Sequence, residues 1–239
     1  MNIAIIGYGK MGHEIEKAAQ SRGINVLSII DPHKPDATHK AINEASMKDV
    51  DVCIDFTRPD AVIGNIKQIS GFKKNIVVGT TGWHDRLSEA KNIVNENNIG
   101  LIYASNFSVG VNIFFKIIEN AAKIMNKLED YDVFGYEIHH NKKLDNPSGT
   151  AKTIEQILVK NIARKKQVPF ASVRAGSIPG THVVGFDSSA DTIELKHVAR
   201  NREGFALGAI MAAEWIQNKK GFFNISHMMD EIMEVNKHV

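Results

Sequence analysis

The segment EIHHNKKLDNPSGTAKT, residues 137–153, gathers residue types that transfer protons and bind anions. Its two adjacent histidines can exchange protons near neutral pH, and its lysines can bind a carboxylate or donate a proton. Its Pro-Ser-Gly-Thr turn precedes a helical pattern, and Gly149 lets a ligand reach the free N–H groups of a helix start. Together these features predict a site for an anion, most economically a carboxylate.

One strand and one helix must hold these groups in place. Alternating hydrophobicity predicts a strand that ends at His139, whose side chain points away from the apolar face. That apolar face is made of Phe134, Tyr136 and Ile138. Ser148 is the expected N-cap of the following helix. Adjacent histidines lack the i, i+4 spacing of a helical zinc pair, and no third ligand is evident in the sequence, so we predict no metal.

The first residues have the order of a dinucleotide site: strand, glycine turn, helix, strand and acid. The run NIAII (2–6) precedes the turn, and the run NVLSII (25–30) ends at Asp31. The turn consists of Gly7, Tyr8, Gly9, Lys10, Met11 and Gly12. Its three glycines permit, in order, the tight turn, the close approach of a pyrophosphate and the packing of the helix on the strand. The N-terminus of that helix then faces the phosphates.

Asp31 lies where an acid would hold the ribose hydroxyls of a dinucleotide. His33 and Lys34 follow closely and could contact a 2′-phosphate, so the sequence leaves the choice between NADH and NADPH open. A glycine turn alone is a weak signal, and a merely structural turn is the alternative. The agreement of strand, helix and acid favours dinucleotide binding.

Strands and helices alternate through the first hundred residues, which predicts a doubly wound parallel sheet of the Rossmann type, an α/β fold. Further strands are expected at 51–57, 75–79 and 100–105, and helices at 60–70 and 84–95. In such sheets the ligand lies beyond the C-terminal ends of the strands. Four small polar residues fall at those ends, and their shared position favours cofactor contact over plain loops: Thr80, Thr81, Ser105 and Asn106.

The pattern changes after residue 107, which divides the chain into a dinucleotide-binding domain (1–107), a second domain (108–201) and a C-terminal segment (202–239). Strands are expected at 172–176, 182–186 and 192–199, and a helix at 203–218. Because no helices separate these strands, we expect them to be antiparallel, in an α+β domain built on a mixed or antiparallel sheet. The sheet's apolar face is a candidate oligomer interface. The tail FFNISHMMDEIMEV is expected to form a last short helix.

Composition narrows the class of protein. The chain has 239 residues, 43% of them hydrophobic, and a net charge of +2 without long basic runs, which argues against a nucleic-acid binder. The single cysteine, Cys53, lies in the apolar run DVCIDF, where a buried side chain is favoured over a reactive thiol. It excludes an intrachain disulfide and suits a reducing compartment. The N-terminal apolar run is too short for a signal peptide or a membrane span, so we expect a soluble, cytoplasmic protein.

The run EIHHNKKLDNPSGTA closely resembles the signature E-x-H-H-x-x-K-x-D-x-P-S-G-T-A of the dihydrodipicolinate reductase family of bacterial lysine biosynthesis, and every fixed position matches. The resemblance extends along the whole chain. It includes GYGKMG, DFT (55–57), GTTG (79–82), ASNFSVGVN (104–112), R-x-G-x-x-P-G-T-H (174–182), E-L-x-H-x-A-x-x-R (194–202) and F-A-x-G-A (205–209). This ordered set is far more specific than any one of its motifs.

The resemblance implies an enzyme that uses NADH or NADPH to reduce the cyclic dicarboxylate formed from aspartate semialdehyde and pyruvate. The product would be tetrahydrodipicolinate, on the route to diaminopimelate and lysine. The family is typically a homotetramer built on the sheet of the second domain, which binds the substrate. Its C-terminal segment returns to the dinucleotide-binding domain.

The resemblance also implies roles for single residues. His139 corresponds to the histidine that donates or accepts a proton, and Lys143 to the lysine that donates one. Substrate contacts correspond to His140, Gly149 and Thr150. The cofactor site corresponds to Gly7 to Gly12, Asp31, Gly79, Thr80, Thr81, Ala104, Ser105, Asn106 and Phe107. Lys142 falls at a variable position of the signature and is expected to face solvent.

One departure from the family pattern concerns Asp31, which is followed by Pro32, whereas many relatives carry glutamate followed by arginine. Cofactor preference therefore stays open.

Two rival hypotheses keep the glycine turn. In the first, another nicotinamide-dependent oxidoreductase acts on a different small acid. In the second, a non-catalytic NAD-binding sensor needs no His139–Lys143 pair and carries a basic DNA-binding module, which we do not find in the sequence.

Overall fold

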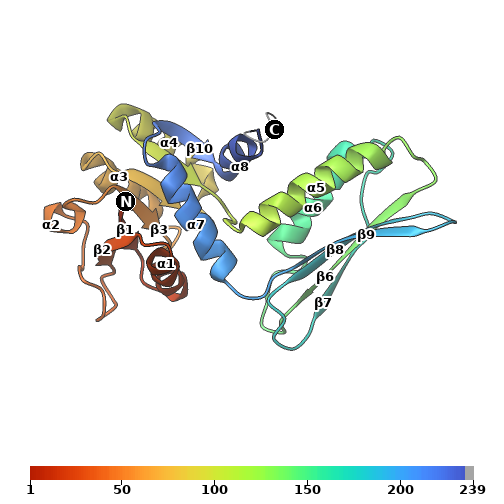
Figure 1. The fold of residues 1–239 in the computed structure, drawn as a ribbon, viewed down its shortest axis with the longest axis horizontal. Helices are drawn as coiled ribbons and strands as arrows, with labels where there is room; N and C mark the ends of the chain where they lie inside the picture. Colours follow the sequence, from red (N-terminus) through yellow and green to blue (C-terminus); the bar gives the residue numbers. More distant parts are fainter. Residues whose placement is uncertain (235–239) are drawn as a thin grey trace. The chain divides into compact units, whose positions relative to one another are not determined.

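The computed structural model describes residues 1–234, which form two compact units (Figure 1). Of the described residues, unit 1 contains Met1–Val109 and 203–234, and unit 2 contains Gly110–Arg202. The sequence-based boundaries, after residues 107 and 201, lie beside these divisions. The last part of the predicted C-terminal segment, residues 235–239, lies outside the described residues.

Unit 1 is built on a parallel sheet of six strands in the order β10-β5-β4-β3-β1-β2. Its strands are β1 (Asn2–Ile6), β2 (Asn25–Ile30), β3 (Val52–Asp55), β4 (Asn75–Val78), β5 (Gly100–Tyr103) and β10 (Gly221–Asn224). Its helices are α1 (Lys10–Ser21), α2 (Glu44–Met47), α3 (Val62–Gly71), the 3-10 helix η1 (His84–Arg86), α4 (Leu87–Asn97), α7 (Glu203–Ile216) and α8 (Ile225–Glu234). The predicted doubly wound α/β fold is confirmed.

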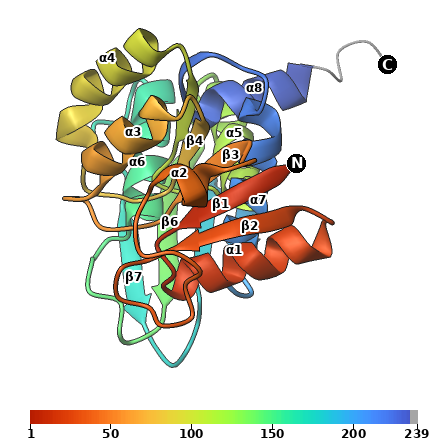
Figure 2. The same ribbon diagram turned by 90° about the vertical axis from the view of Figure 1, so that its left-hand side faces the viewer.

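Two hydrophobic cores, one on each face of this sheet, hold unit 1 together. Along β1, Ile3 and Ile5 enter the core under α1, α7 and α8, whereas Ala4 and Ile6 enter the core under α2, α3 and α4. Figures 1 and 2 show these helices on the two sides of the strands. Because β2 and β3 flank β1 on opposite sides, the order of strand addition reverses there. Such a reversal opens a ligand crevice at the C-terminal ends of the strands.

The expectation for the tail is wrong at its start. The residues FFN lie in β10, which pairs in parallel with β5 and adds a sixth strand to the sheet; the pairs include Phe222 with Leu101. Helix α8 begins only at Ile225. A strand of four residues carries too little periodicity to be separated from the helix that follows it. No helix within residues 1–234 is long and apolar enough to cross a membrane.

Unit 2 is built on a mixed sheet of four strands in the order β7-β6-β8-β9. Its strands are β6 (Asp132–His139), β7 (Phe170–Arg174), β8 (Thr181–Asp187) and β9 (Thr192–Val198). Helices α5 (Val109–Met125) and α6 (Gly149–Asn161) lie together on one face of the sheet, as Figure 1 shows. Phe114 and Ile118 of α5 meet Ile154 and Leu158 of α6 in the core between helices and sheet.

The predicted antiparallel arrangement of the last three strands is right for β8 and β9 but wrong for β7. Strand β7 pairs in parallel with β6, because α6 carries the chain back across the sheet between them. The resulting register sets Glu137 of β6 beside Ser172 of β7 on one side and His182 of β8 on the other. All three side chains therefore point to the face that α5 and α6 cover.

Candidate active site

The glycine turn leaves β1 at the C-terminal edge of the parallel sheet. Gly7 has a φ of +89°, and a Cβ there would lie 2.6 Å from the carbonyl oxygen of Phe56, so the turn requires glycine. A Cβ on Gly12 would lie 2.5 Å from the carbonyl oxygen of Gly7, which limits this position of α1 to glycine as well. Gly9 differs, since a Cβ there would meet nothing within 4 Å. Open space beside the N-terminus of α1 fits the pyrophosphate of a dinucleotide.

Asp31 follows β2 and ties the glycine turn to the next loop. Its carboxylate accepts hydrogen bonds from the N–H of Tyr8 at 2.9 Å and the N–H of His33 at 2.8 Å. Burial opposes ionisation of this carboxyl, but the N–H donors outweigh burial and lower the pKa of Asp31 below its ordinary value. Asp31 is therefore an anion at neutral pH, held in one place, as an acid that binds ribose hydroxyls must be.

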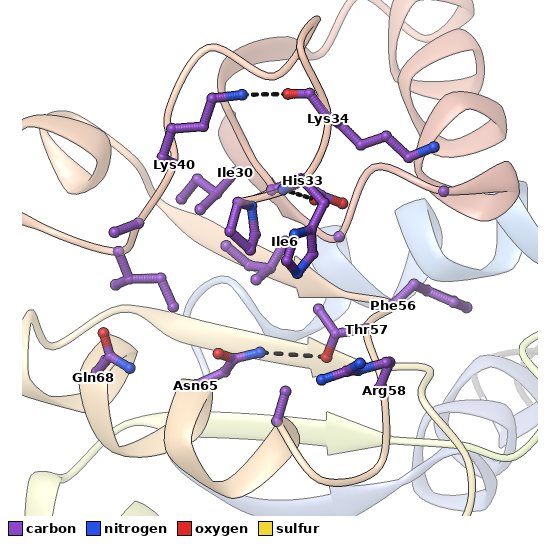
Figure 3. Close-up of a pocket in the computed structure, with 17 residues that line it drawn as sticks. Ile6, Ile30, His33, Lys34, Lys40, Phe56, Thr57, Arg58, Asn65 and Gln68 are labelled. Atoms are coloured by element: carbon purple, nitrogen blue, oxygen red, sulfur yellow. Dashed lines mark hydrogen bonds between the residues drawn. The ribbon is translucent and has the colours of Figure 1, made fainter.

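A pocket of about 510 Å³ adjoins Asp31 (Figure 3). That volume is within the usual range for small-molecule sites. The turn after β1, the loop after β2 and the first turns of α3 enclose it, and Figure 3 shows His33, Lys34 and Arg58 among its lining side chains. The ammonium of Lys40 donates to the carbonyl oxygen of Lys34 across the loop. The pocket thus combines a fixed carboxylate with several cationic groups.

The ends of β4 and β5 hold the other sequence-predicted cofactor residues. Thr80 is buried, and its hydroxyl accepts from the N–H of Thr57 at 2.8 Å and donates to Asp55 at 3.1 Å, so this hydroxyl is used within the protein. Gly79 packs against the ring of Phe56, where a Cβ would lie 2.0 Å from Cζ. Of the remainder, Ala104 and Phe107 are buried, Asn106 is half-buried, and Thr81 and Ser105 are exposed.

In unit 2, the strand end and the loop after it bring the predicted proton-transfer residues together. His139 is the last residue of β6 and only 6% exposed. The N–H of His140 donates to the carbonyl oxygen of Ile178 at 2.8 Å, which fixes the chain as it leaves the strand. The N–H of Lys143 then donates to the carbonyl oxygen of His140 at 3.1 Å. This turn directs the chain at Lys143 back toward the strand end.

Lys143 belongs to a small set of groups near the start of α6 that can bind an anion. Its Nζ is 2.7 Å from Oδ1 of Asp145. The bond with Lys143 is the main cause that lowers the pKa of Asp145, and the N–H of Gly149 adds to it. Ser148 caps α6 by accepting from the N–H of Ala151 at 3.2 Å. The predicted substrate contacts Gly149 and Thr150 are the first two residues of this helix, where backbone N–H groups attract anions.

Glu137 lies at the centre of the site and is fully buried. Its Oε1 accepts three hydrogen bonds, from the N–H of Ser148 at 2.9 Å, the hydroxyl of Ser172 at 2.8 Å and the guanidinium of Arg174 at 2.9 Å. Burial opposes ionisation, but these donors outweigh it and lower the pKa of Glu137 to about 2. Its Oε2 lies 3.3 Å from Nδ1 of His139 and 3.4 Å from Nε2 of His182. Glu137 is therefore a permanent anion between two imidazoles.

Both imidazoles favour the neutral form. Burial lowers the pKa of His139, Lys143 and Arg174 add to that effect, and Glu137 opposes it. Burial also lowers the pKa of His182, to about 4, with a further contribution from His139. The two rings meet edge to face with centroids 5.0 Å apart. Neutral imidazoles can accept or donate a proton through either nitrogen, depending on the tautomer.

The ligand atoms of Glu137, His139 and His182 lie within 4.8 Å of one another, a spacing that a metal ion could use. The sequence did not reveal this third ligand, because His182 is remote in the chain. The guanidinium of Arg174 already neutralises the same carboxylate, which weakens the case for a divalent cation there. The absence of a metal stays a prediction.

Sequence reasoning assigned no role to Glu137, Arg174 or His182. All three lie in motifs of the ordered set, the first in E-x-H-H and the others at the two ends of R-x-G-x-x-P-G-T-H. Their common location depends on the parallel pairing of β7 with β6 and on the register of β8, so no spacing within a single segment predicts it. Charged and titratable residue types at strand positions were the available signal.

Comparisons with known proteins agree with the motif resemblance. The family models described as "Dihydrodipicolinate reductase, N-terminus" and "Dihydrodipicolinate reductase, C-terminus" match residues 1–107 and 110–229. The 4-hydroxy-tetrahydrodipicolinate reductase of Christiangramia forsetii is 40% identical over 244 residues, which cover 98% of this chain and 100% of the relative. The protein of that name from Buchnera aphidicola subsp. Schizaphis graminum is 40% identical over 204 residues, 77% of this chain and 73% of the relative.

The fold also resembles that of a solved structure. It is a dipicolinate-bound dihydrodipicolinate reductase from Paenisporosarcina sp. TG-14, which aligns with a TM-score of 0.81 over 95% of this chain and 98% of the other. The two sequences are 24% identical, so this likeness concerns the fold.

Proposed function

The chain belongs to the dihydrodipicolinate reductase family, and we infer that it reduces 4-hydroxy-tetrahydrodipicolinate to tetrahydrodipicolinate with NADH or NADPH, in the biosynthesis of diaminopimelate and lysine. This inference rests on the match of both family models along the chain. In addition, each unit contains a site with the required chemistry. The glycine turn serves the cofactor in unit 1. The loop between β6 and α6 serves an anionic substrate in unit 2.

We assign dicarboxylate binding to the start of α6 and to the loop before it. Two substrate carboxylates need at least two groups that hold anions. The N–H groups of Gly149 and Thr150 supply one, and His140 with Lys143 supplies the other. The dipicolinate named for the structural neighbour is a cyclic dicarboxylate of the same kind, which supports this class of substrate.

In unit 1, the turn Gly7–Gly12 would hold the pyrophosphate of the cofactor and Asp31 its ribose hydroxyls. Bound NADH or NADPH supplies a hydride to an electron-poor double bond of the substrate. Overall the substrate gains this hydride and one proton and loses its 4-hydroxyl group as water. The protein must therefore deliver the proton and stabilise the negative charge that develops. We assign the proton to His139 and Lys143, and the charge stabilisation to Lys143 and the start of α6.

A coupled assay tests this function. Substrate is generated from pyruvate and aspartate semialdehyde, the protein is added, and the oxidation of NADH and of NADPH is followed in separate reactions. We expect turnover with at least one cofactor. Turnover only of other imino or keto acids would favour a different oxidoreductase. Binding of cofactor without turnover of any acid would favour the non-catalytic sensor.

We further propose that the protein forms a homotetramer through the face of the unit 2 sheet that α5 and α6 leave open. Val173, Ile138, Thr181 and Val198 lie side by side across all four strands of that face. Val173 is 46% and Val198 is 53% exposed in the single chain, so a partner would bury apolar surface there. Light scattering should give four times the chain mass. Val173→Glu should reduce this mass and leave the fold, measured by circular dichroism, unchanged.

We also propose that the protein works in the cytoplasm. Its one cysteine, Cys53, is a buried free thiol, which suits a reducing compartment but does not require one. A biosynthetic reductase also depends on the intracellular pool of NADH or NADPH. Fractionation of cells that express the tagged chain would test this, and recovery mainly in the membrane or secreted fraction would contradict it.

A further inference from the structure

The carboxylate of Glu137 and the imidazole of His139 form a pair that the proposed reaction has not yet used. Oε2 of Glu137 and Nδ1 of His139 are 3.3 Å apart. Both atoms are buried. Nδ1 has no hydrogen-bond partner elsewhere among the described residues, and the other neighbour of Oε2 is Nε2 of His182 at 3.4 Å. At this distance a small rotation of the ring is enough to complete an N–H···O bond. Buried polar atoms without partners are rare, so two that face each other call for a common explanation.

The rest of the carboxylate is fixed by other groups. Three donors from two elements hold Oε1: Ser148 at the cap of α6, and Ser172 and Arg174 on β7. Arg174 also donates to the carbonyl oxygen of Asp145 at 2.8 Å, so it anchors the loop that carries Lys143. Because Oε1 is saturated, Oε2 is the only oxygen left for the imidazole. The carboxylate is therefore oriented before any substrate arrives.

The imidazole has two nitrogens with different surroundings. Nδ1 is enclosed and faces Glu137, whereas Nε2 lies toward Gly180, where a Cβ would come within 3.0 Å of it. A carboxylate at Nδ1 selects the tautomer with the proton on Nδ1 and leaves the lone pair on Nε2. Second partners of this kind set the orientation and basicity of a functional histidine.

We propose that Glu137 is a positioning residue, which holds the proton of His139 on Nδ1 and thereby makes Nε2 the atom that exchanges a proton with the substrate. This inference rests on the proposed function, since it needs His139 to act in the reaction. It predicts that Glu137 touches neither substrate nor cofactor. Its negative charge also stabilises the imidazolium form of His139, against the effects of burial, Lys143 and Arg174.

The test compares Glu137→Gln with His139→Gln and with Glu119→Gln. The last variant removes the same charge from α5, where Glu119 pairs with Lys123 on the surface. In Glu137→Gln, an amide N–H would face Nδ1 and favour the wrong tautomer. We expect kcat to fall about a hundredfold, with little change in the KM for NADPH. Glu119→Gln should keep the wild-type kcat.

The pH profile separates positioning from a merely structural role. The groups that face His139 are Glu137 on its own strand, Arg174 on β7, His182 on β8, and Lys143 with Asp145 in the loop. Glu137→Gln removes the negative charge of Glu137 and leaves the other groups in place, so the pKa of His139 should fall. The limb of the plot of kcat against pH that reports His139 should therefore move to lower pH. A purely structural defect would lower kcat without moving that limb.

The possible outcomes are distinguishable. If His139→Gln loses activity while Glu137→Gln keeps both its kcat and its pH profile, the positioning role is wrong and the proposed function stands. If His139→Gln keeps full kcat, the catalytic assignment of His139 fails, and the role of Glu137 fails with it. Should Glu137→Gln not fold, nitrogen chemical shifts of the wild-type protein decide, since the proposal requires the proton on Nδ1 of neutral His139 and is overturned by a proton on Nε2.

A last control addresses a metal at Glu137, His139 and His182. The wild-type protein, dialysed against a chelator, should keep its kcat. Loss of activity that zinc restores would overturn the positioning role in favour of a metal site.

Discussion

The Nζ of Lys143 lies 2.7 Å from Oδ1 of Asp145, so the ammonium assigned to proton donation and charge stabilisation is paired with a carboxylate of its own loop. The N–H of Gly149 acts on the same carboxylate. Asp145 therefore contacts two of the groups that we assign to a substrate carboxylate. A dicarboxylate that binds here must displace Asp145 or share its partners.

Replacing Asp145 with asparagine should make the substrate bind more tightly. An exposed ion pair contributes up to about 1 kcal/mol, which corresponds to about a fivefold decrease in the KM for the substrate. The KM for NADPH should not change. Steady-state kinetics of Asp145→Asn measures both values. A rise in the substrate KM, together with loss of kcat, would mean that Asp145 is needed to place Lys143 correctly.

Loss of either proposed proton donor should affect turnover and not cofactor binding. Positioned acid–base groups contribute about 10²- to 10⁴-fold to rate, so kcat should fall by that order in His139→Gln and in Lys143→Ala. The dissociation constant for NADPH, measured by fluorescence titration, should stay near the wild-type value, because the glycine turn is intact. Lys142→Ala is the matched control, since Lys142 is exposed and adjacent in the chain. Full kcat in both variants would refute the catalytic assignment.

The glycine turn offers a test that separates folding from cofactor binding. A methyl group at position 12 would clash with the carbonyl oxygen of Gly7 at 2.5 Å, so Gly12→Ala should lower the free energy of unfolding by about 1–3 kcal/mol. A methyl group at position 9 meets no protein atom within 4 Å, so Gly9→Ala should fold as the wild type does. It should nevertheless weaken NADPH binding about tenfold, because the pyrophosphate must come close to the backbone there.

Urea unfolding without cofactor and titration with NADPH measure the two effects separately. Wild-type cofactor affinity in Gly9→Ala would place the pyrophosphate elsewhere. Unchanged stability in Gly12→Ala would mean that α1 shifts to make room.

Residues near one another in sequence were predictable, and those joined only by tertiary pairing were not. The turn Gly7–Gly12 and Asp31 follow from spacing alone, because one βαβ unit sets their geometry. Alternation along β6 correctly put Glu137 and His139 on one face. Alternation could not show that this polar face is the buried one. The face can be buried only because donors from β7 and the start of α6 form hydrogen bonds with Glu137. The parallel pairing of β7 was missed for the same reason, whereas β10 was missed because its four residues carry too little periodicity.

Cofactor preference can be tested at Lys34, which lines the pocket beside Asp31. Its side chain is exposed, and we expect it to contact the 2′-phosphate of a bound NADPH. Lys34→Ala should raise the KM for NADPH about fivefold, because it removes one charge interaction of about 1 kcal/mol. The KM for NADH should stay within about twofold. Lys48→Ala, an exposed charge outside the pocket, is the control. Equal effects on both cofactors would contradict a contact with the 2′-phosphate.

Acid should destabilise the folded protein in two stages, and His182 should account for part of the first. Its pKa in the folded protein is lowered from 6.5 to about 4 by burial and by His139. Between these values the unfolded chain binds a proton that the folded chain does not, so stability falls as pH falls. This contribution is complete above pH 6.5 and is lost by about pH 4. The second stage belongs to Glu137, whose pKa is lowered from 4.5 to about 2, and its contribution is lost as pH falls through that lower range.

His182→Gln should therefore flatten the dependence of stability on pH between 6.5 and 4. The difference between wild type and variant across this window is on the order of 3 kcal/mol, since each pKa unit corresponds to about 1.4 kcal/mol. Urea unfolding at several pH values measures the slope, which matters more than the absolute stability because the substitution also changes packing. Equal slopes in wild type and His182→Gln would show that the folded protein already binds the proton at His182.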